Sequence, residues 1–328
     1  MLREPAGLGL VHGLRRGGRA GGRMRRGAVG VLVLSAILCA GDVAAQDVAA
    51  LLAAGKAGAT VTLPAGTFAA GDLVVPAGVS VRGAGYGKTI LDAAGHRVGL
   101  RVSGGEAITV SDFTLRGATA AALHVEGGTG LTAARLRLLD SGVGLRAEGV
   151  SGARFENLVI AGNGTGGVLR ECQDSVFANC TAADNRDLAI SLAGNRGGAV
   201  FNNLFINSQL GMYDGGGNER LAVDCNLYVA LFVGGLAGQP TRESLAAWRA
   251  LTGFDRRSVE LPVQFADPAR RDYRPVLALP WCLARATTAD WGTAELAGFA
   301  APPADINGNA RSGGMDLGAF ETTLTAPR

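Results

Sequence analysis

One pattern of apolar and polar residues recurs about every 22 residues between positions 99 and 216. Six similar segments, GLRVSG, ALHVEG, GLRAEG, GVLREC, AISLAG and GMYDGG, each carry an apolar anchor at their second position. These anchors are Leu100, Leu123, Leu145, Val168, Ile190 and Met212. Polar and apolar residues alternate after each anchor, and a second short apolar run follows a turn. This alternation predicts short strands that bury one face.

Such short strands cannot bury their apolar face alone, so successive repeats must stack on one another. Helical repeats need ~33 residues or more, and these segments instead contain Gly, Asn and β-branched residues. The sequence therefore predicts an all-β fold, a right-handed parallel β-helix. Each repeat forms one coil, and neighbouring coils lie ~4.8 Å apart.

Asparagine or aspartate recurs at two further positions of the repeat. Asn tolerates the left-handed backbone of a sharp bend, and its amide can bond to the copies above and below it. We therefore expect two structural ladders, each at one corner of the coil. The first contains Asn157, Asn179, Asn203 and Asn226, and the second contains Asp140, Asn163, Asn185 and Asn207.

Residues 1–45 have the pattern of a secretory signal. An Arg-rich stretch precedes an apolar run at 28–40, which is shorter than the ~20 residues that span a bilayer. Small residues follow, so we expect cleavage after Ala45, and Met24 could itself begin a signal of ordinary length. These features predict a secreted or periplasmic protein with no membrane attachment after cleavage.

Removing the leader changes the charge balance. The leader holds seven Arg and two acidic residues, so 24 basic and 26 acidic residues remain of the 31 and 28 in the whole chain. This balance leaves no basic patch for nucleic acid. Glycine accounts for 51 of 328 residues, about twice the usual ~7%, which suits a fold with many turns. We expect a monomer.

The coil pattern resembles the pectin-lyase-like superfamily. The segment DVAALLAAGKAGATVTLPAGTF, at 47–68, is similar to the opening of those proteins, in which a short helix caps the end of the solenoid. The segment LVVPAGVSVRGAGYGKTIL, at 73–91, is similar to their first coil. This resemblance implies a β-helix over 46–235, with an N-terminal capping helix. It does not specify the chemistry, because the superfamily contains lyases, hydrolases, esterases, epimerases and non-enzymes.

The remainder, 236–328, resembles the tail of exported bacterial β-helix proteins. Its closing segment DINGNARSGGMDLGAFE, at 305–321, fits their DxxGxxR…G…D-GA-E pattern. An amphipathic helix is expected over 241–254, with Thr241 as its cap, Glu243 in its first turn and Gly253 at its end. Its face of Leu245, Trp248 and Leu251 is expected to cover the open end of the coils. The tail is therefore predicted to be a capping wrap.

Two outward columns of the coil carry candidate chemistry. One residue past each anchor stand Arg101, His124, Arg146, Leu169, Ser191 and Tyr213, and three past stand Ser103, Glu126, Glu148, Glu171, Ala193 and Gly215. Stacking would place Glu126, Glu148 and Glu171 ~4.8 Å apart. Three close carboxylates repel one another, and Ca²⁺, which prefers oxygen ligands, would relieve that repulsion. The alternative is a solvated lattice of Arg–Glu pairs, each worth about 0.2–1 kcal/mol.

The cationic column suggests binding of an acidic sugar chain. The expected substrate-binding residues are Arg101, His124, Arg146 and Tyr213. Calcium together with an Arg or Tyr could remove the C5 proton of a uronate and so cause β-elimination. The candidate catalytic residues are Arg146, Arg186 and Tyr213, although Arg186 stands in a charged turn that turn chemistry also explains.

Three functions remain open from the sequence. The first is an exported protein that binds or processes polysaccharide, with an acidic, uronan-type chain as the expected ligand. The second is a polysaccharide lyase that uses calcium-assisted β-elimination with an atypical base, since the chain has only two Lys, Lys56 and Lys88. The third is a purely structural solenoid of the cell envelope.

Overall fold

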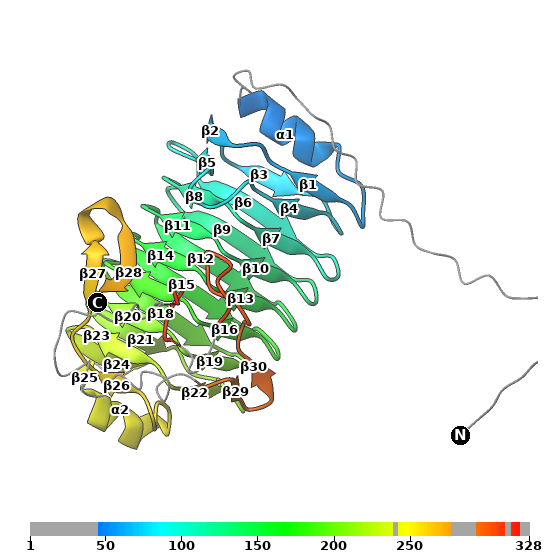
Figure 1. The fold of residues 1–328 in the computed structure, drawn as a ribbon. Helices are drawn as coiled ribbons and strands as arrows, with labels where there is room; N and C mark the ends of the chain where they lie inside the picture. The colour runs from blue at the N-terminus through cyan, green and yellow to red at the C-terminus, as the bar shows by residue number, and fades with distance from the viewer. Residues whose placement is uncertain (1–44, 239–241, 277–292, 312–315, 322–328) are drawn as a thin grey trace, which may run out of the picture. The chain divides into compact units, whose positions relative to one another are not determined.

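The computed structural model describes residues 45–238, 242–276, 293–311 and 316–321, and the predicted signal at 1–44 lies outside them. Three parallel sheets wind around a common core in about eight turns (Figure 1). The predicted right-handed parallel β-helix is confirmed. In this part of the chain, no helix is long and apolar enough to cross a membrane.

Each coil contributes one strand to each sheet, so a strand pairs with the third strand before it and the third after it. Sheet A consists of β1 (Thr60–Thr62), β4 (Ser80–Arg82), β7 (Thr109–Ser111), β10 (Thr132–Ala134), β13 (Arg154–Glu156), β16 (Val176–Ala178), β19 (Ala199–Phe201) and β22 (Ala222–Asp224). Sheet B consists of β2 (Gly66–Ala69), β5 (Thr89–Asp92), β8 (Thr114–Arg116), β11 (Arg137–Leu139), β14 (Val159–Ala161), β17 (Thr181–Ala183), β20 (Leu204–Ile206), β23 (Leu227–Val229) and β26 (Val259–Glu260).

Sheet C carries the longest strands and closes with an antiparallel edge strand. It consists of β3 (Leu73–Val75), β6 (Val98–Ser103), β9 (Ala121–Glu126), β12 (Val143–Glu148), β15 (Thr165–Arg170), β18 (Leu188–Ala193), β21 (Leu210–Asp214), β24 (Phe232–Leu236) and the antiparallel β25 (Arg242–Glu243). Strand β24 ends at Leu236, and β26 adds a further strand to sheet B beyond residue 235.

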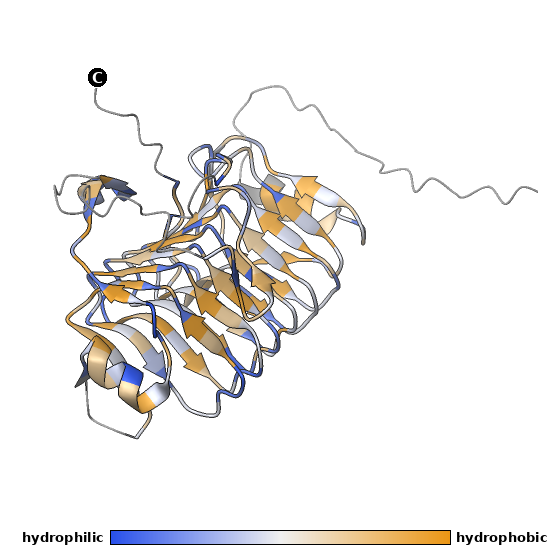
Figure 2. Cartoon of the chain, turned by 60° about the horizontal axis from the view of Figure 1, so that its bottom comes forward, coloured by the Kyte–Doolittle hydropathy of each residue, from blue (hydrophilic) through white to orange (hydrophobic). Residues whose placement is uncertain are grey.

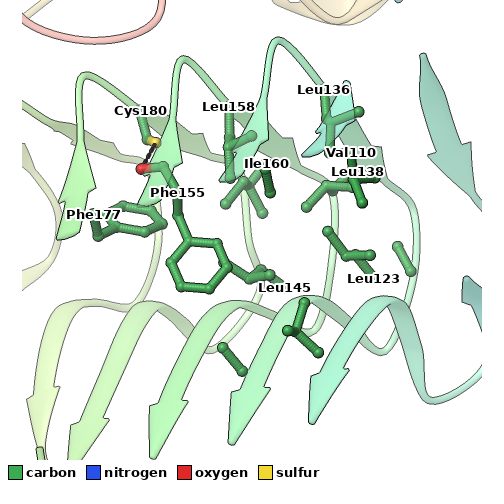
Figure 3. Packing of buried hydrophobic residues seen from close by; sticks show 14 of the residues in the cluster. Val110, Leu123, Leu136, Leu138, Leu145, Phe155, Leu158, Ile160, Phe177 and Cys180 are labelled. Atoms are coloured by element: carbon green, nitrogen blue, oxygen red, sulfur yellow. Dashed lines mark hydrogen bonds between the residues drawn. The ribbon is translucent and has the colours of Figure 1, made fainter. Parts of the chain in front are cut away.

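The core consists of inward side chains from all three sheets. Leu123 and Leu145 from sheet C face Leu138 and Ile160 from sheet B, and all four are fully buried (Figure 3). Phe155 and Phe177 occupy equivalent positions on neighbouring strands of sheet A. Hydrophobic stretches follow the strands, and hydrophilic residues gather at the turns (Figure 2). The 22-residue apolar pattern is therefore the pattern of the core.

Two helices cap the coils. Helix α1 (Ala45–Ala53) buries Val48 and Leu52 against the first coil, which fits the expected N-terminal cap. Helix α2 (Leu245–Thr252) begins four residues later than the predicted helix. Its N-cap is Ser244, whose side chain accepts a hydrogen bond from the backbone of Ala247.

Two predictions for α2 need correction. Thr241, the predicted cap, lies outside the described residues, and Glu243 belongs to β25 rather than to the first turn of the helix. Leu251 is 53% exposed, so it does not cover the coil end. Trp248, in contrast, is fully buried, and the helix ends at Gly253 in the left-handed conformation, as expected.

Trp248 is held by a buried carboxylate. Asp255 accepts hydrogen bonds from the indole of Trp248 (2.9 Å), the hydroxyls of Tyr228 (2.9 Å) and Ser258 (2.5 Å), and the amide of Asn226 (3.1 Å). Burial raises the pKa of Asp255, even though these hydrogen bonds favour its ionised form. This hub joins α2 to the last coil.

The C-terminal segment covers the outer faces of sheets A and B over the later coils. On sheet A, β29 (Glu295–Leu296) and β30 (Phe299–Ala300) pack against Val176, Ala178, Ala199 and Phe201. On sheet B, a second apolar cluster is covered by a hairpin and by residues 306 and 317–320. The hairpin consists of β27 (Gln264–Asp267), the 3₁₀ turn η1 (Pro268–Arg270) and β28 (Asp272–Val276). The predicted wrap therefore packs on two of the three sheets.

The closing motif of this wrap is a docking element. Arg311, whose side chain is fully buried, contacts Glu321 at 3.1 Å and donates to Asn157 at 2.9 Å. Gly318 has φ +84, and a Cβ added there would lie 2.7 Å from Leu204 and from Thr181. The glycine of the motif is therefore required both by its backbone conformation and by its contact with sheet B.

The two predicted asparagine ladders each divide into two adjacent columns. Asn157 and Asn179 occupy the left-handed bend, whereas Asn203 and Asn226 stand one position later, in the inward column of Cys180. At the second corner, Asp140 and Asn207 occupy the bend, and Asn163 and Asn185 stand one position later. The expectation that each set shares one bend is wrong, because the register places Asn202 rather than Asn203 beside Asn179, and Gly162 rather than Asn163 beside Asp140.

The two kinds of column have different partners. In the inward column Asn203 donates to Asn226 at 3.0 Å and to the carbonyl of Phe177 at 3.1 Å, which is a ladder between coils. Asn163 and Asn185 form the same contact at 3.0 Å. In the bend column the amide of Asn179 donates instead to the carbonyl of Asp316 in the C-terminal wrap. At the first corner the bend residues Asn157 and Asn179 therefore bind the wrap, whereas the inward residues connect the coils.

Candidate binding face

The outer face of sheet C presents the predicted cationic column. In the observed register this column contains Arg101, His124, Arg146, Val168, Ser191 and Tyr213. Val168 replaces the predicted Leu169, which points inward and is 4% exposed. The described hydrogen bonds of 293–311 and 316–321 to the coils involve sheets A and B and the corner between them. No described contact of the wrap thus covers this face.

The prediction that three glutamates stack in one column is wrong. Glu126 and Glu148 are register neighbours, but the next residue in their column is Arg170. Glu171 lies in the bend after β15, with φ +54, and its side chain is exposed. The error arose because Gly167, rather than Val168, occupies the inward anchor position beside Leu145.

Within the described residues, no group of three or more His, Cys, Asp or Glu side chains could hold a metal ion. The pair Glu126 and Glu148 is instead neutralised by neighbouring cations. Because Arg170 replaces the third carboxylate, the repulsion that called for calcium is removed. The proposed ligand set of Glu126, Glu148 and Glu171 therefore does not exist as a cluster.

Ion pairs connect the two columns of the outer face. Glu148 lies 3.1 Å from Arg146, 3.5 Å from His124 Nε2 and 3.9 Å from Arg170, while Arg101 lies 3.2 Å from Glu126. The Nε2 atom of His124 is buried and has no hydrogen bond within the described chain. This network matches the predicted Arg–Glu lattice, with three Arg and one His against two carboxylates.

The predicted catalytic residues do not converge. Arg146 lies on β12, and Tyr213 lies on β21, three coils later, which corresponds to ~14 Å. Arg186 lies in the turn before β18, where it binds Asp187 through two hydrogen bonds of 3.0 and 2.9 Å. The hydrogen bonds to Asp187 raise the pKa of Arg186, so its guanidinium stays protonated and cannot accept a proton from a substrate.

Two features near this face were not predicted from the sequence. Arg170 completes the ion-pair lattice, and an alignment with Gly167 as the anchor would have found it. A third asparagine ladder stands at the corner after sheet C, where Asn195 donates to Asn218 at 2.9 Å. The 23-residue spacing between these two asparagines is the sequence feature from which this ladder could have been predicted.

Comparison with known proteins agrees with the architecture. Residues 79–228 match the family profile described as "Right handed beta helix region", which covers less than half of the chain. This segment is a right-handed β-helix. A comparison with curated protein sequences found no match.

Several solved structures resemble this β-helix in fold at low sequence identity. An alginate lyase from Paenibacillus sp. has 14% identity and a TM-score of 0.39, with 66% of this chain and 97% of that chain covered. A pectin methylesterase from carrot has 14% identity and a TM-score of 0.36, with coverages of 67% and 87%. The catalytic domain of an α-1,3-glucanase has 15% identity and a TM-score of 0.39 over 51% of this chain, which spans 35% of that domain. At this level the likeness concerns the fold and not the chemistry.

Proposed function

We propose that the protein is exported and binds an extended acidic polysaccharide along the outer face of sheet C. The observation that carries this proposal is the set of guanidinium groups on that face. Arg101, Arg146 and Arg170 are 38, 35 and 56% exposed, and they come from coils that follow one another closely. Counted with Glu126 and Glu148, they leave a surplus of positive charge before any protonation of His124.

The spacing of the coils supports a polymeric ligand. Equivalent residues repeat every ~4.8 Å along the solenoid, so the cations form a line rather than a pocket. An Arg fork binds a carboxylate or sulfate with two parallel hydrogen bonds. Each contact on an exposed face is weak, but linked contacts along one chain strengthen binding greatly.

The proposal is binding and does not include β-elimination. The calcium ligands that motivated elimination are not assembled, and Arg146, Arg186 and Tyr213 lie too far apart to act on one sugar. A structural solenoid without a ligand is the remaining alternative. Absence of polysaccharide binding would favour it.

The test is calorimetric titration with a linear polyuronate and with a neutral glucan of similar length. The polyuronate should bind, its affinity should fall as salt rises, and Arg146→Ala should weaken it. Arg82→Ala is the control, because Arg82 is also an ion-paired surface arginine, 65% exposed against 35% for Arg146, but lies on sheet A. Equal binding of the neutral glucan, or equal loss in both variants, would contradict the proposal.

Export is tested separately. A fusion of residues 24–45 to a periplasmic reporter should carry the reporter across the inner membrane, with processing after Ala45. Mature protein from the native host that still begins at Met1 or Met24 would rule out this part of the proposal.

A further inference from the structure

The outer face of sheet C changes its chemistry along the solenoid. The strands β6, β9 and β12 carry most of the charged residues, and Arg170 at the end of β15 is the last of them. Otherwise β15 and the later strands present partly exposed apolar and hydroxyl side chains. These are Thr165, Val168, Leu188, Ser191, Leu210 and Tyr213. We call this second part the apolar half of the face.

On the other two sheets, apolar side chains that point outward are buried by another part of the chain. On sheets A and B, residues such as Phe201 and Leu204 are buried by the C-terminal wrap. No described contact of the wrap buries the apolar half of sheet C in the same way. The apolar half is continuous with the charged half, because Arg146 and Val168 are register neighbours. One linear ligand can therefore lie across both.

Tyr213 is the largest side chain of the apolar half. Its neighbours in the same column are small, with Ser191 on one side and Gly235 on the other. A Cβ at Gly235 would lie 3.0 Å from Leu210 and 3.6 Å from the Tyr213 ring, so the ring and Leu210 pack beside a bare backbone. The hydroxyl of Tyr213 has no hydrogen bond to the described residues. An aromatic ring in this setting can stack on the apolar face of a sugar.

We propose that the apolar half binds uncharged, methyl- or acetyl-bearing sugar units of the same polymer, with Tyr213 as the stacking residue. This inference rests on the proposed function and narrows its ligand to a partly esterified acidic polysaccharide. The charged units lie over Arg101 and Arg146, and the esterified units lie ~14 Å away over Tyr213. A fully ionised polymer uses only the first half.

The test compares polygalacturonate with the same polymer after partial methyl esterification, both at matched chain length. The wild-type protein should bind the esterified polymer roughly tenfold more tightly, the gain from burying about two methyl groups. Tyr213→Ala should remove this preference and leave the affinity for polygalacturonate within about twofold. Tyr213→Phe, which keeps the ring, should retain the preference.

Arg146→Ala separates the two proposals. It should weaken both polymers together, because both use the charged half. If the wild-type protein binds polygalacturonate but does not prefer the esterified form, the subsite is refuted and the proposed function stands. The subsite is refuted also if Tyr213→Ala weakens both polymers equally. If neither polymer binds, both proposals fail. A melting curve for each variant confirms that it is folded.

Discussion

The covered faces of sheets A and B and the open face of sheet C are built from the same coils, yet their outward residues differ. Under the wrap these residues are apolar, and Phe201, Ala178 and Leu204 are at most 3% exposed. On the open face they include Arg101 and Arg146, held in exposed ion pairs. The outward residues are thus apolar where the wrap packs on sheets A and B, and charged along the first half of the open face. Changes under the wrap should cost stability, and changes on the open face should cost only binding.

The largest expected effect is at the docking glycine of the wrap. Gly318→Ala should destabilise the protein by about 2–3 kcal/mol, since it adds a Cβ in contact with Leu204 and Thr181 to the cost of a left-handed Ala. Urea unfolding measures the loss. Gly298→Ala is the control, because Gly298 has the same φ of +84 with no atom within 4 Å, and it should cost about 1 kcal/mol. Equal costs would contradict the docking contact.

A slightly smaller loss is expected in the inward asparagine column. Asn203→Leu leaves the carbonyl of Phe177 and the amide of Cys180 without their partners, which should cost about 2 kcal/mol. Asn207→Ala, at an exposed bend, should cost less than about 1 kcal/mol, because water can replace its bond to Asp184. Similar values from urea unfolding would mean that the inward column has no special role.

The free energy of unfolding should depend on pH through the ionisation of Asp255, the buried carboxylate that holds α2. The pKa of Asp255 is raised above 3.8, so the folded protein binds more protons than the unfolded chain between 3.8 and the folded value. The free energy of unfolding contributed by this group therefore falls as pH rises through that interval. Asp255→Asn should remove this slope, although it also lowers overall stability. An unchanged slope in urea unfolding at a series of pH values would contradict the assignment.

The smallest effect on stability is expected on the open face. Arg146→Ala and Glu126→Gln should each change the free energy of unfolding by less than about 0.5 kcal/mol, because exposed ion pairs contribute little. A loss above about 2 kcal/mol would show that the lattice supports the fold, and the contrast between covered and open faces would then fail.

The parts of this molecule that follow from its sequence are those with a repeating signal. The 22-residue spacing predicted the coils, because stacked coils bury equivalent residues. It failed at Gly167, where a glycine takes the inward anchor position and the neighbouring Ile190 packs beside it. That one-residue slip turned Glu171 into a false ligand and concealed Arg170. A slip of one residue reverses the side of every side chain in a strand.

The asparagine columns and the wrap show a second limit. Asn179 and Asn203 look equivalent in sequence, but one binds the C-terminal segment and the other bonds to the next coil. Only the fold shows which face the wrap covers, since its contacts join residues more than 130 positions apart. The wrap has no internal repeat, so its docking could not be predicted from periodicity.

The most direct test of the central claim, that the open face of sheet C holds the polymer, is hydroxyl-radical footprinting with and without a partly methyl-esterified polyuronate, which should cover both halves of the face. Bound polymer should lower the reactivity of His124 and Tyr213, which both lie on that face. Leu251 and Val276, which are 53 and 45% exposed elsewhere in the fold, should keep their reactivity. If Leu251 or Val276 is protected while His124 and Tyr213 are unchanged, the polymer binds another surface and the account is wrong.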